Sequence, residues 1–319
     1  MLSGILDKVT GFLDRRMVLI SLLPSGAFWA AVVILTASEI GWVHATGWWT
    51  RLDGPRQLLD SAATVALLVL FASVLSAQEG ALLRLYEGYW GEWGPGAWLA
   101  ALMASWHRRQ ITHLNLDDDV QFERRYRNYP RRPEDAMPTR LGNVLKGAEQ
   151  YPADEGRYGI DAVFFWPRLI AVVPEATRVD LADARTTLSL MLNVSALSAV
   201  LGVGSLLTIG ILEVRLRGAL WITAAGAALV SVLAYRSALS AAQVYAELVR
   251  SVFDVYRGDL LDRLGYVMPS SLAGERELWC NLGQQLYRRD ASRPEVLDAA
   301  RKRTTAASAN PQQAQLPPS

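Results

Sequence analysis

The sequence predicts an all-α integral membrane protein with four transmembrane helices in two hairpins and a helical cytosolic portion. Two uncharged stretches, Leu188 to Leu212 and Ala219 to Tyr235, form the clearest pair, and apolar stretches at about 17–38 and 61–78 form another. A helix rises roughly 1.5 Å per residue and the hydrocarbon core is about 30 Å thick, so about twenty apolar residues cross it. Helical periodicity in the remaining sequence completes the all-α prediction.

The composition supports a chain that is partly in lipid and partly in water. Of its 319 residues, 51% are hydrophobic and 20% are charged. The 32 basic and 31 acidic residues leave a net charge of +1, so the basic surplus that drives nucleic-acid binding is absent and we expect no nucleic-acid partner. Cys280 is the single cysteine, which excludes an internal disulfide, and we expect it to pack beside Trp279.

Residues 1–90 are predicted to form the N-terminal hairpin. Its first span, 17–38, follows Arg16 and contains Pro24, which membrane helices tolerate as a kink. The apolar core of this segment is too long for a signal peptide, so we expect it to be a retained anchor. The helix of the second span, 61–78, is expected to continue through Tyr89.

Residues 91–186 are predicted to form a cytosolic helical region. A helix is expected over Trp98 to Arg109, and Thr139 is positioned to cap a helix that begins at Arg140. A second amphipathic segment, 161–173, is interrupted by a proline and is expected to pack against neighbouring helices or to lie at the headgroup boundary.

Residues 187–237 are predicted to form the C-terminal hairpin, whose arms at 188–212 and 219–235 are joined by a charged turn through Glu213 and Arg215. No helix-breaking residue follows the fourth span, so one helix is expected to run from Ala219 to Leu264. Residues 238–290 are then predicted to form cytosolic amphipathic helices, with a short one at 275–289. The low apolar content of 291–319 predicts a disordered tail, above all from Thr304.

Basic residues near the span ends predict the orientation. They precede the first and third spans and follow the second and fourth, at positions that include Arg16, Arg84, Arg185 and Arg236. Because basic residues favour the cytoplasmic side, both termini are expected in the cytosol.

Small and polar side chains form a stripe on one face of the third span, at Ser195, Ser198, Gly202 and Ser205. Small residues let membrane helices approach closely, which favours a tight hairpin with the fourth span. The same hydroxyls in several subunits of a homo-oligomer would instead line a narrow polar pore. The sequence leaves both interpretations open.

An apolar face follows the fourth span and is a candidate cytosolic interaction face. Its residues recur at helical spacing while charged residues occupy other sides of the same helix. They are Tyr245, Leu248, Val249, Val252, Tyr256 and Leu260.

No catalytic, cofactor or metal signature is present, so we expect no enzyme activity and no cofactor. His113 and Asp117 stand four residues apart near His107, but a metal site needs three or four convergent ligands. The run Asp117 to Asp119 is expected to be a charged turn or a capping cluster.

Three stretches, Pro138–Asn143, Tyr158–Val163 and Trp166–Arg168, resemble those of uncharacterised bacterial polytopic membrane proteins. This resemblance implies a location in a bacterial inner membrane and brings no activity with it. The arrangement of two hairpins flanking cytosolic helices is also similar, in architecture alone, to the bestrophin channel family. Together these patterns predict a non-enzymatic membrane protein that presents a helical cytosolic interaction module. Its expected partners are the lipid bilayer, further copies of itself and a cytosolic protein. The alternative is a homo-oligomeric ion channel or pore lined by the third span.

Overall fold

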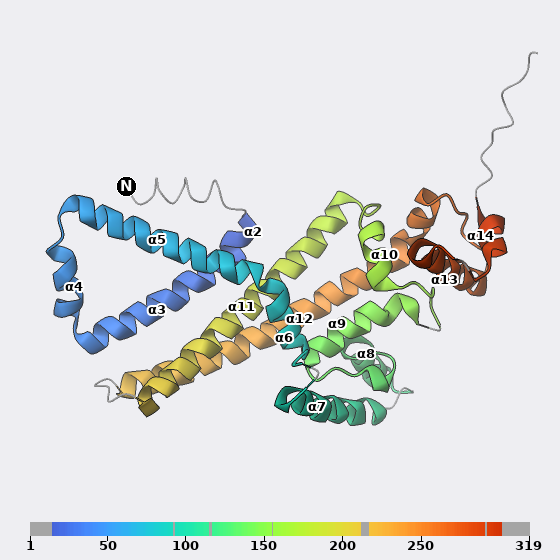
Figure 1. Cartoon of the computed structure of the whole chain (residues 1–319). Coiled ribbons are helices and arrows are strands. Elements are labelled where there is room, and N and C mark those ends of the chain that lie inside the picture. Colours follow the sequence, from blue (N-terminus) through green and yellow to red (C-terminus); the bar gives the residue numbers. More distant parts are fainter. Residues whose placement is uncertain are drawn as a thin grey trace, which may run out of the picture. The chain divides into compact units, whose positions relative to one another are not determined.

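The computed structural model describes residues 15–91, 93–114, 117–154, 156–211, 217–290 and 292–301, and these residues form an all-α structure (Figure 1). Four helices are long and apolar enough to cross a membrane, at 20–40, 54–77, 175–211 and 217–263. This confirms the prediction of an all-α chain with four candidate spans. The turn predicted through Glu213 and Arg215 and the tail predicted from Thr304 lie outside the described residues.

The chain divides into two compact units. The first contains residues 1–148 and 179–248, and the second contains 149–178 and 249–319. The predicted region 91–186 is therefore divided: its part up to Ala148 groups with the candidate spans, and 149–178 groups with the C-terminal residues. We describe each unit by itself.

The N-terminal hairpin of the first unit consists of α3 (Leu23–Ile40) and α5 (Gly54–Ala77), joined by α4 (Trp42–Thr50). Figure 1 shows α3 and α5 diverging toward α4. A short helix α2 (Arg15–Met17) and a π-helical turn η1 (Val18–Leu22) precede α3. The turn η1 packs against α5, so the two arms meet where the chain enters the first span.

The predicted continuation of the second span is interrupted. Helix α5 ends at Ala77, Gln78 adopts a non-helical ψ of 6°, and a separate helix α6 (Glu79–Glu87) follows. Gly88, with a φ of +103°, then ends α6 in the left-handed region that glycine tolerates. The apolar periodicity runs through Gln78, but the direction of the chain changes there.

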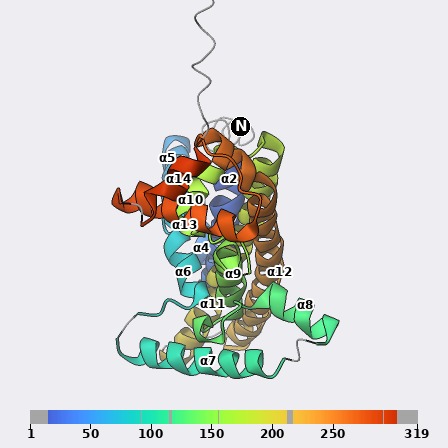
Figure 2. The same ribbon diagram turned by 90° about the vertical axis from the view of Figure 1, so that its right-hand side faces the viewer.

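The C-terminal hairpin consists of α11 (Glu175–Ile211) and α12 (Arg217–Arg263). Both views show the two helices running side by side (Figures 1 and 2). The expected continuous helix through 219–264 is confirmed, because α12 is unbroken over 47 residues. Helix α11 begins thirteen residues before the predicted span. Its residues 175–178 and residues 249–263 of α12 belong to the second unit.

Between the hairpins, the first unit contains α7 (Pro95–Thr112), α8 (Asp119–Asn128), the 3-10 turn η2 (Pro133–Asp135) and α9 (Arg140–Gln150). The Thr139 hydroxyl accepts a hydrogen bond from the Gly142 N–H at 2.9 Å, so the predicted cap of α9 is confirmed. Asp118 caps α8 by accepting from the N–H groups of Val120 and Gln121.

The second unit contains the 3-10 turn η3 (Tyr151–Ala153), α10 (Ala162–Leu169), α13 (Leu272–Arg288), α14 (Pro294–Ala300) and the polar ends of α11 and α12. The rings of Phe165 and Trp279 meet edge-on at 5.1 Å in its core, and both side chains are buried. Two predictions are wrong here. Helix α14 lies within the predicted disordered tail, with Leu297 buried, and Cys280 is exposed.

Candidate functional site

The predicted stripe on α11 lies mainly at its contact with α12. The Ser195 hydroxyl donates to the Ser231 carbonyl at 3.0 Å, and the Ser231 hydroxyl donates to the Ser195 carbonyl at 2.9 Å. A Cβ built on Gly202 would lie 3.4 Å from the Ala227 Cβ and 3.5 Å from the Ala224 carbonyl oxygen. Small residues therefore hold these two helices of one chain close together.

The other two members of the stripe have different environments. Ser198 is half-buried, and the buried Ser205 hydroxyl donates to the Leu201 carbonyl of its own helix at 2.8 Å. Tyr86, on α6, donates its hydroxyl to Ser195 at 2.9 Å. Ser195, the most buried of the stripe's serines, thus links α6, α11 and α12.

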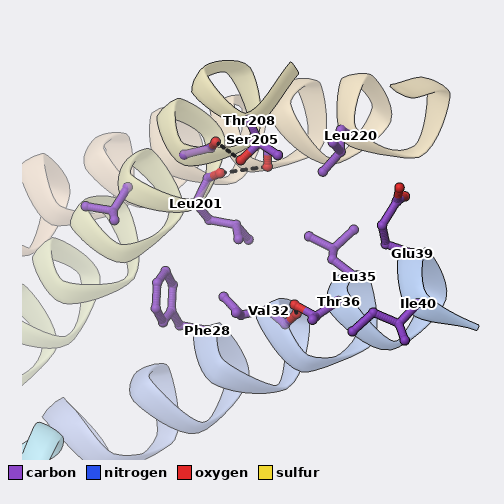
Figure 3. Close-up of a pocket in the computed structure, with 12 residues that line it drawn as sticks. Phe28, Val32, Leu35, Thr36, Glu39, Ile40, Leu201, Ser205, Thr208 and Leu220 are labelled. Carbon is purple, nitrogen blue, oxygen red and sulfur yellow. Dashed lines mark hydrogen bonds between the residues drawn. The ribbon is translucent and has the colours of Figure 1, made fainter. Parts of the chain in front are cut away.

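Ser205 also lines a cavity of about 430 Å³ between α3 and the C-terminal hairpin (Figure 3). The Thr36 and Thr208 hydroxyls donate to carbonyl groups of their own helices, both at 2.8 Å, so they do not reach across the cavity. Glu39 lies at one end. The lining residues are Phe28, Val32, Leu35, Thr36, Glu39, Ile40, Val200, Leu201, Gly204, Ser205, Thr208 and Leu220. This lining is mainly apolar.

A proline in the first span creates a polar contact that the sequence analysis missed. In a regular helix the Ile20 carbonyl would accept from the N–H of residue 24, which is a proline and has none. The helix widens here, with the Leu23 N–H donating to the Val18 carbonyl five residues earlier. The Asn193 side chain on α11 donates to the Ile20 carbonyl at 2.8 Å and thereby satisfies it.

Further buried polar atoms surround this widened turn. The hydroxyls of Ser21 and Ser25 and the Oδ1 atom of Asn193 are buried and have no hydrogen-bond partner among the described residues. Ser21 and Ser25 stand four residues apart, on either side of Pro24 in the sequence, and so lie on the same helical face. The sequence signal for this contact is a proline within one span, which leaves the carbonyl four residues earlier without a donor, together with an asparagine within another span.

Polar and charged side chains from α2 and α11 converge on Glu79, the first residue of α6. Its Oε1 atom accepts from the Ser189 hydroxyl at 2.6 Å and from the Arg16 guanidinium at 3.2 Å, and Arg185 Nε lies 3.8 Å away. Residues 185, 189 and 193 stand four apart, so one face of α11 carries the charged, hydroxyl and amide contacts in sequence. The N-terminal end of the first hairpin and the polar part of α11 therefore meet at one end of the candidate spans.

The stretch Pro138–Asn143 forms a joint between α6 and α9. The Thr139 hydroxyl donates to the Tyr86 carbonyl at 2.7 Å, and a Cβ on Gly142 would lie 2.1 Å from the Glu87 carbonyl oxygen, so only glycine fits there. The Asn143 amide donates to the Met137 carbonyl at 2.9 Å, and its buried oxygen accepts from the Met137 N–H at 2.8 Å. This stretch has a structural role: it fixes the end of α6.

The histidines and aspartates near α8 do not form a metal site in the described part of the chain, where no group of three or more His, Cys, Asp and Glu residues could hold a metal ion. The His107 ring is buried between the rings of Trp106 and Tyr129. Burial, followed by the nearby Arg140 charge, lowers the pKa of His107. Hydrogen bonds from the start of α8 lower the pKa of Asp118, as expected of a capping carboxylate.

The candidate interaction face on α12 is divided between the two units. Tyr245 and Leu248 belong to the first and are half-buried. The remaining residues belong to the second, where three are buried and the Tyr256 hydroxyl lies 3.3 Å from that of Thr177. The buried residues are Val249, Val252 and Leu260. These side chains pack within the chain, so they are not a free surface for a partner.

Asp254 holds the segment after α9 against α12 in the second unit. Its two carboxylate oxygens accept from the hydroxyls of Tyr151 and Tyr158, at 2.9 and 2.8 Å. Arg257 stacks on the Tyr158 ring at 3.8 Å and donates to the buried Glu275 at 2.8 Å. Burial, followed by the hydrogen bond and charge of Asp254, raises the pKa of Tyr158. These groups bind one another, so the cluster acts as a structural clasp.

Comparison with known proteins finds no matching family model, no matching curated protein and no matching solved structure.

Proposed function

We propose that the protein is a multi-pass protein of a bacterial inner membrane that anchors a helical module on the cytosolic side, where the module binds a protein partner. One observation carries the proposal: α12 is a single helix whose first part is apolar enough to cross a membrane and whose last part contributes to the core of the second unit. A continuous helix is a direct physical link between lipid and an aqueous module.

The proposed orientation is supported by the Glu79 cluster. Arg16 and Arg185 precede different spans, yet both approach the same carboxylate and so lie at one end of the spans. Basic residues at span ends favour the cytoplasmic side. Both termini then lie in the cytosol together with the second unit.

Packing of the third span favours the anchored module over a pore. A pore-lining stripe must face water. Ser195 is instead hydrogen-bonded to Ser231, and Gly202 contacts α12 within the same chain. The proposed partner surface lies on the second unit, where large apolar side chains of α10 and α13 are exposed. Val163 is 67% exposed and Tyr287 is 75% exposed, and Phe164 supports the Tyr287 ring at 5.7 Å.

The test places a photo-crosslinking amino acid at Tyr287 in cells, with the exposed Glu295 as a matched control position. We expect one defined protein adduct at 287 that Val163→Asp reduces, and none at 295. Equal labelling at both positions, or none in folded protein, contradicts the proposal. Purified protein in liposomes tests the homo-oligomeric channel: reproducible currents altered by Ser198→Leu would favour that function instead.

A further inference from the structure

Helix α7 has two apolar faces, of which the protein covers one. Ala104, His107 and Ile111 are buried against the first unit. On another side of the helix, large side chains remain exposed at spacings of three, four and eight residues. These are Trp98, Leu99, Leu102, Met103 and Trp106, with exposed fractions between 38% and 68%. Such a face needs an apolar partner, because exposed apolar surface of this extent is unusual in water.

The position of α7 in the chain places it near the lipid boundary. It follows α6 by seven residues, and α6 follows the candidate span α5 after one residue. Tyr86 of α6 contacts Ser195, which lies within the apolar part of α11. Within this first unit, α7 runs across the direction of α12 in Figure 2 and is inclined to it in Figure 1. This is the direction of a helix that lies along a membrane surface.

The residue types also match the boundary between headgroups and acyl chains. Tryptophan is enriched there because its ring is apolar and its N–H is polar, and α7 exposes two tryptophans. Arg108 and Arg109 are exposed in the last turn and complement the negative charge of anionic headgroups. Tryptophan is also enriched at protein interfaces, but the closeness of α7 to the candidate spans favours lipid as its partner.

We propose that α7 is an interfacial helix whose Trp98–Trp106 face inserts into the headgroup region of the phospholipid bilayer. The face then lies about 5–10 Å deep in the boundary layer, as amphipathic helices do. The covered side, with His107 against Tyr129, ties the helix to α8 and so connects the bilayer surface to the segment that precedes α9.

The test uses a nitroxide label on full-length protein in vesicles of phosphatidylethanolamine and phosphatidylglycerol. In a Cys280→Ser background, Leu102→Cys puts the label on the exposed apolar face, and Arg108→Cys puts it on an exposed polar position as the matched control. Power-saturation EPR then compares access of oxygen, which concentrates in lipid, with access of a nickel chelate, which stays in water.

We expect the label at 102 to be reached mainly by oxygen and the label at 108 mainly by nickel. Trp98→Cys repeats the measurement where Leu102→Cys yields too little folded protein. Nickel access at 102 equal to that at 108 would show a water-exposed face and overturn the proposal. Protection at 102 from both reagents would also overturn it, and dipolar broadening in that case would identify a second copy of the chain as the partner.

Discussion

The contact between Asn193 and the Ile20 carbonyl predicts a specific coupling with Pro24. Asn193→Leu removes the amide that donates to this carbonyl at 2.8 Å, and Pro24 offers no N–H in its place. A buried group left without a partner costs about 1–3 kcal/mol in proteins generally, and hydrogen bonds between membrane helices average about 0.6 kcal/mol. We therefore expect a loss of about 1 kcal/mol in the free energy of unfolding, which is roughly a fivefold change in the folded-to-unfolded ratio.

The decisive measurement is a double-mutant cycle. In a Pro24→Ala background, residue 24 regains an N–H that can donate to the Ile20 carbonyl, so Asn193→Leu should cost much less there. Loss of the Asn193 Oδ1 atom, which has no partner among the described residues, contributes equally to both arms and cancels. Reversible unfolding in mixed micelles gives the four free energies, and Val200→Leu, at an exposed position of α11, is the control. Equal costs of Asn193→Leu in both backgrounds would refute the reasoning.

Three further predictions concern packing, the clasp and pH. Gly202→Leu should separate α11 from α12 and lower the free energy of unfolding by about 1–3 kcal/mol. Gly210→Leu should not, because a Cβ at Gly210 meets nothing within 4 Å. A thermal melt in detergent compares the two variants, and equal effects would contradict the close packing. Asp254→Ala leaves two tyrosine hydroxyls without their acceptor, so hydrogen exchange in residues 149–160 should accelerate, while Asp259→Ala, at an exposed position, should leave exchange unchanged. Folding lowers the pKa of His107 below its ordinary value of 6.5, so as the pH falls the unfolded chain takes up this proton at a higher pH than the folded chain. Stability should therefore fall as the pH drops below 6.5. Melting temperatures measured from about pH 8 to about pH 5 should show this loss, and His107→Phe should reduce it.

The sequence predicted the four candidate spans, the start of α9 and the length of α12, because each depends on local pattern. Apolar length alone indicated the four candidate spans, and Thr139 before an apolar run indicated the start of α9. The absence of helix breakers after Tyr235 predicted the long α12. The break at Gln78 was missed because apolar periodicity continues through it, although Gly80 stands two residues later.

By itself, then, the sequence determined the helical class, the candidate spans and the absence of a recognisable catalytic motif, since these depend on composition and spacing along one chain. Only the tertiary structure decided what each helix face contacts. The serine and glycine stripe of α11 could not be assigned to α12 from spacing, because a small-residue face suits a neighbouring helix and a pore equally. Likewise, the Ile20 carbonyl acquires its partner 173 residues away in Asn193, a pairing that only the folded bundle brings within 2.8 Å.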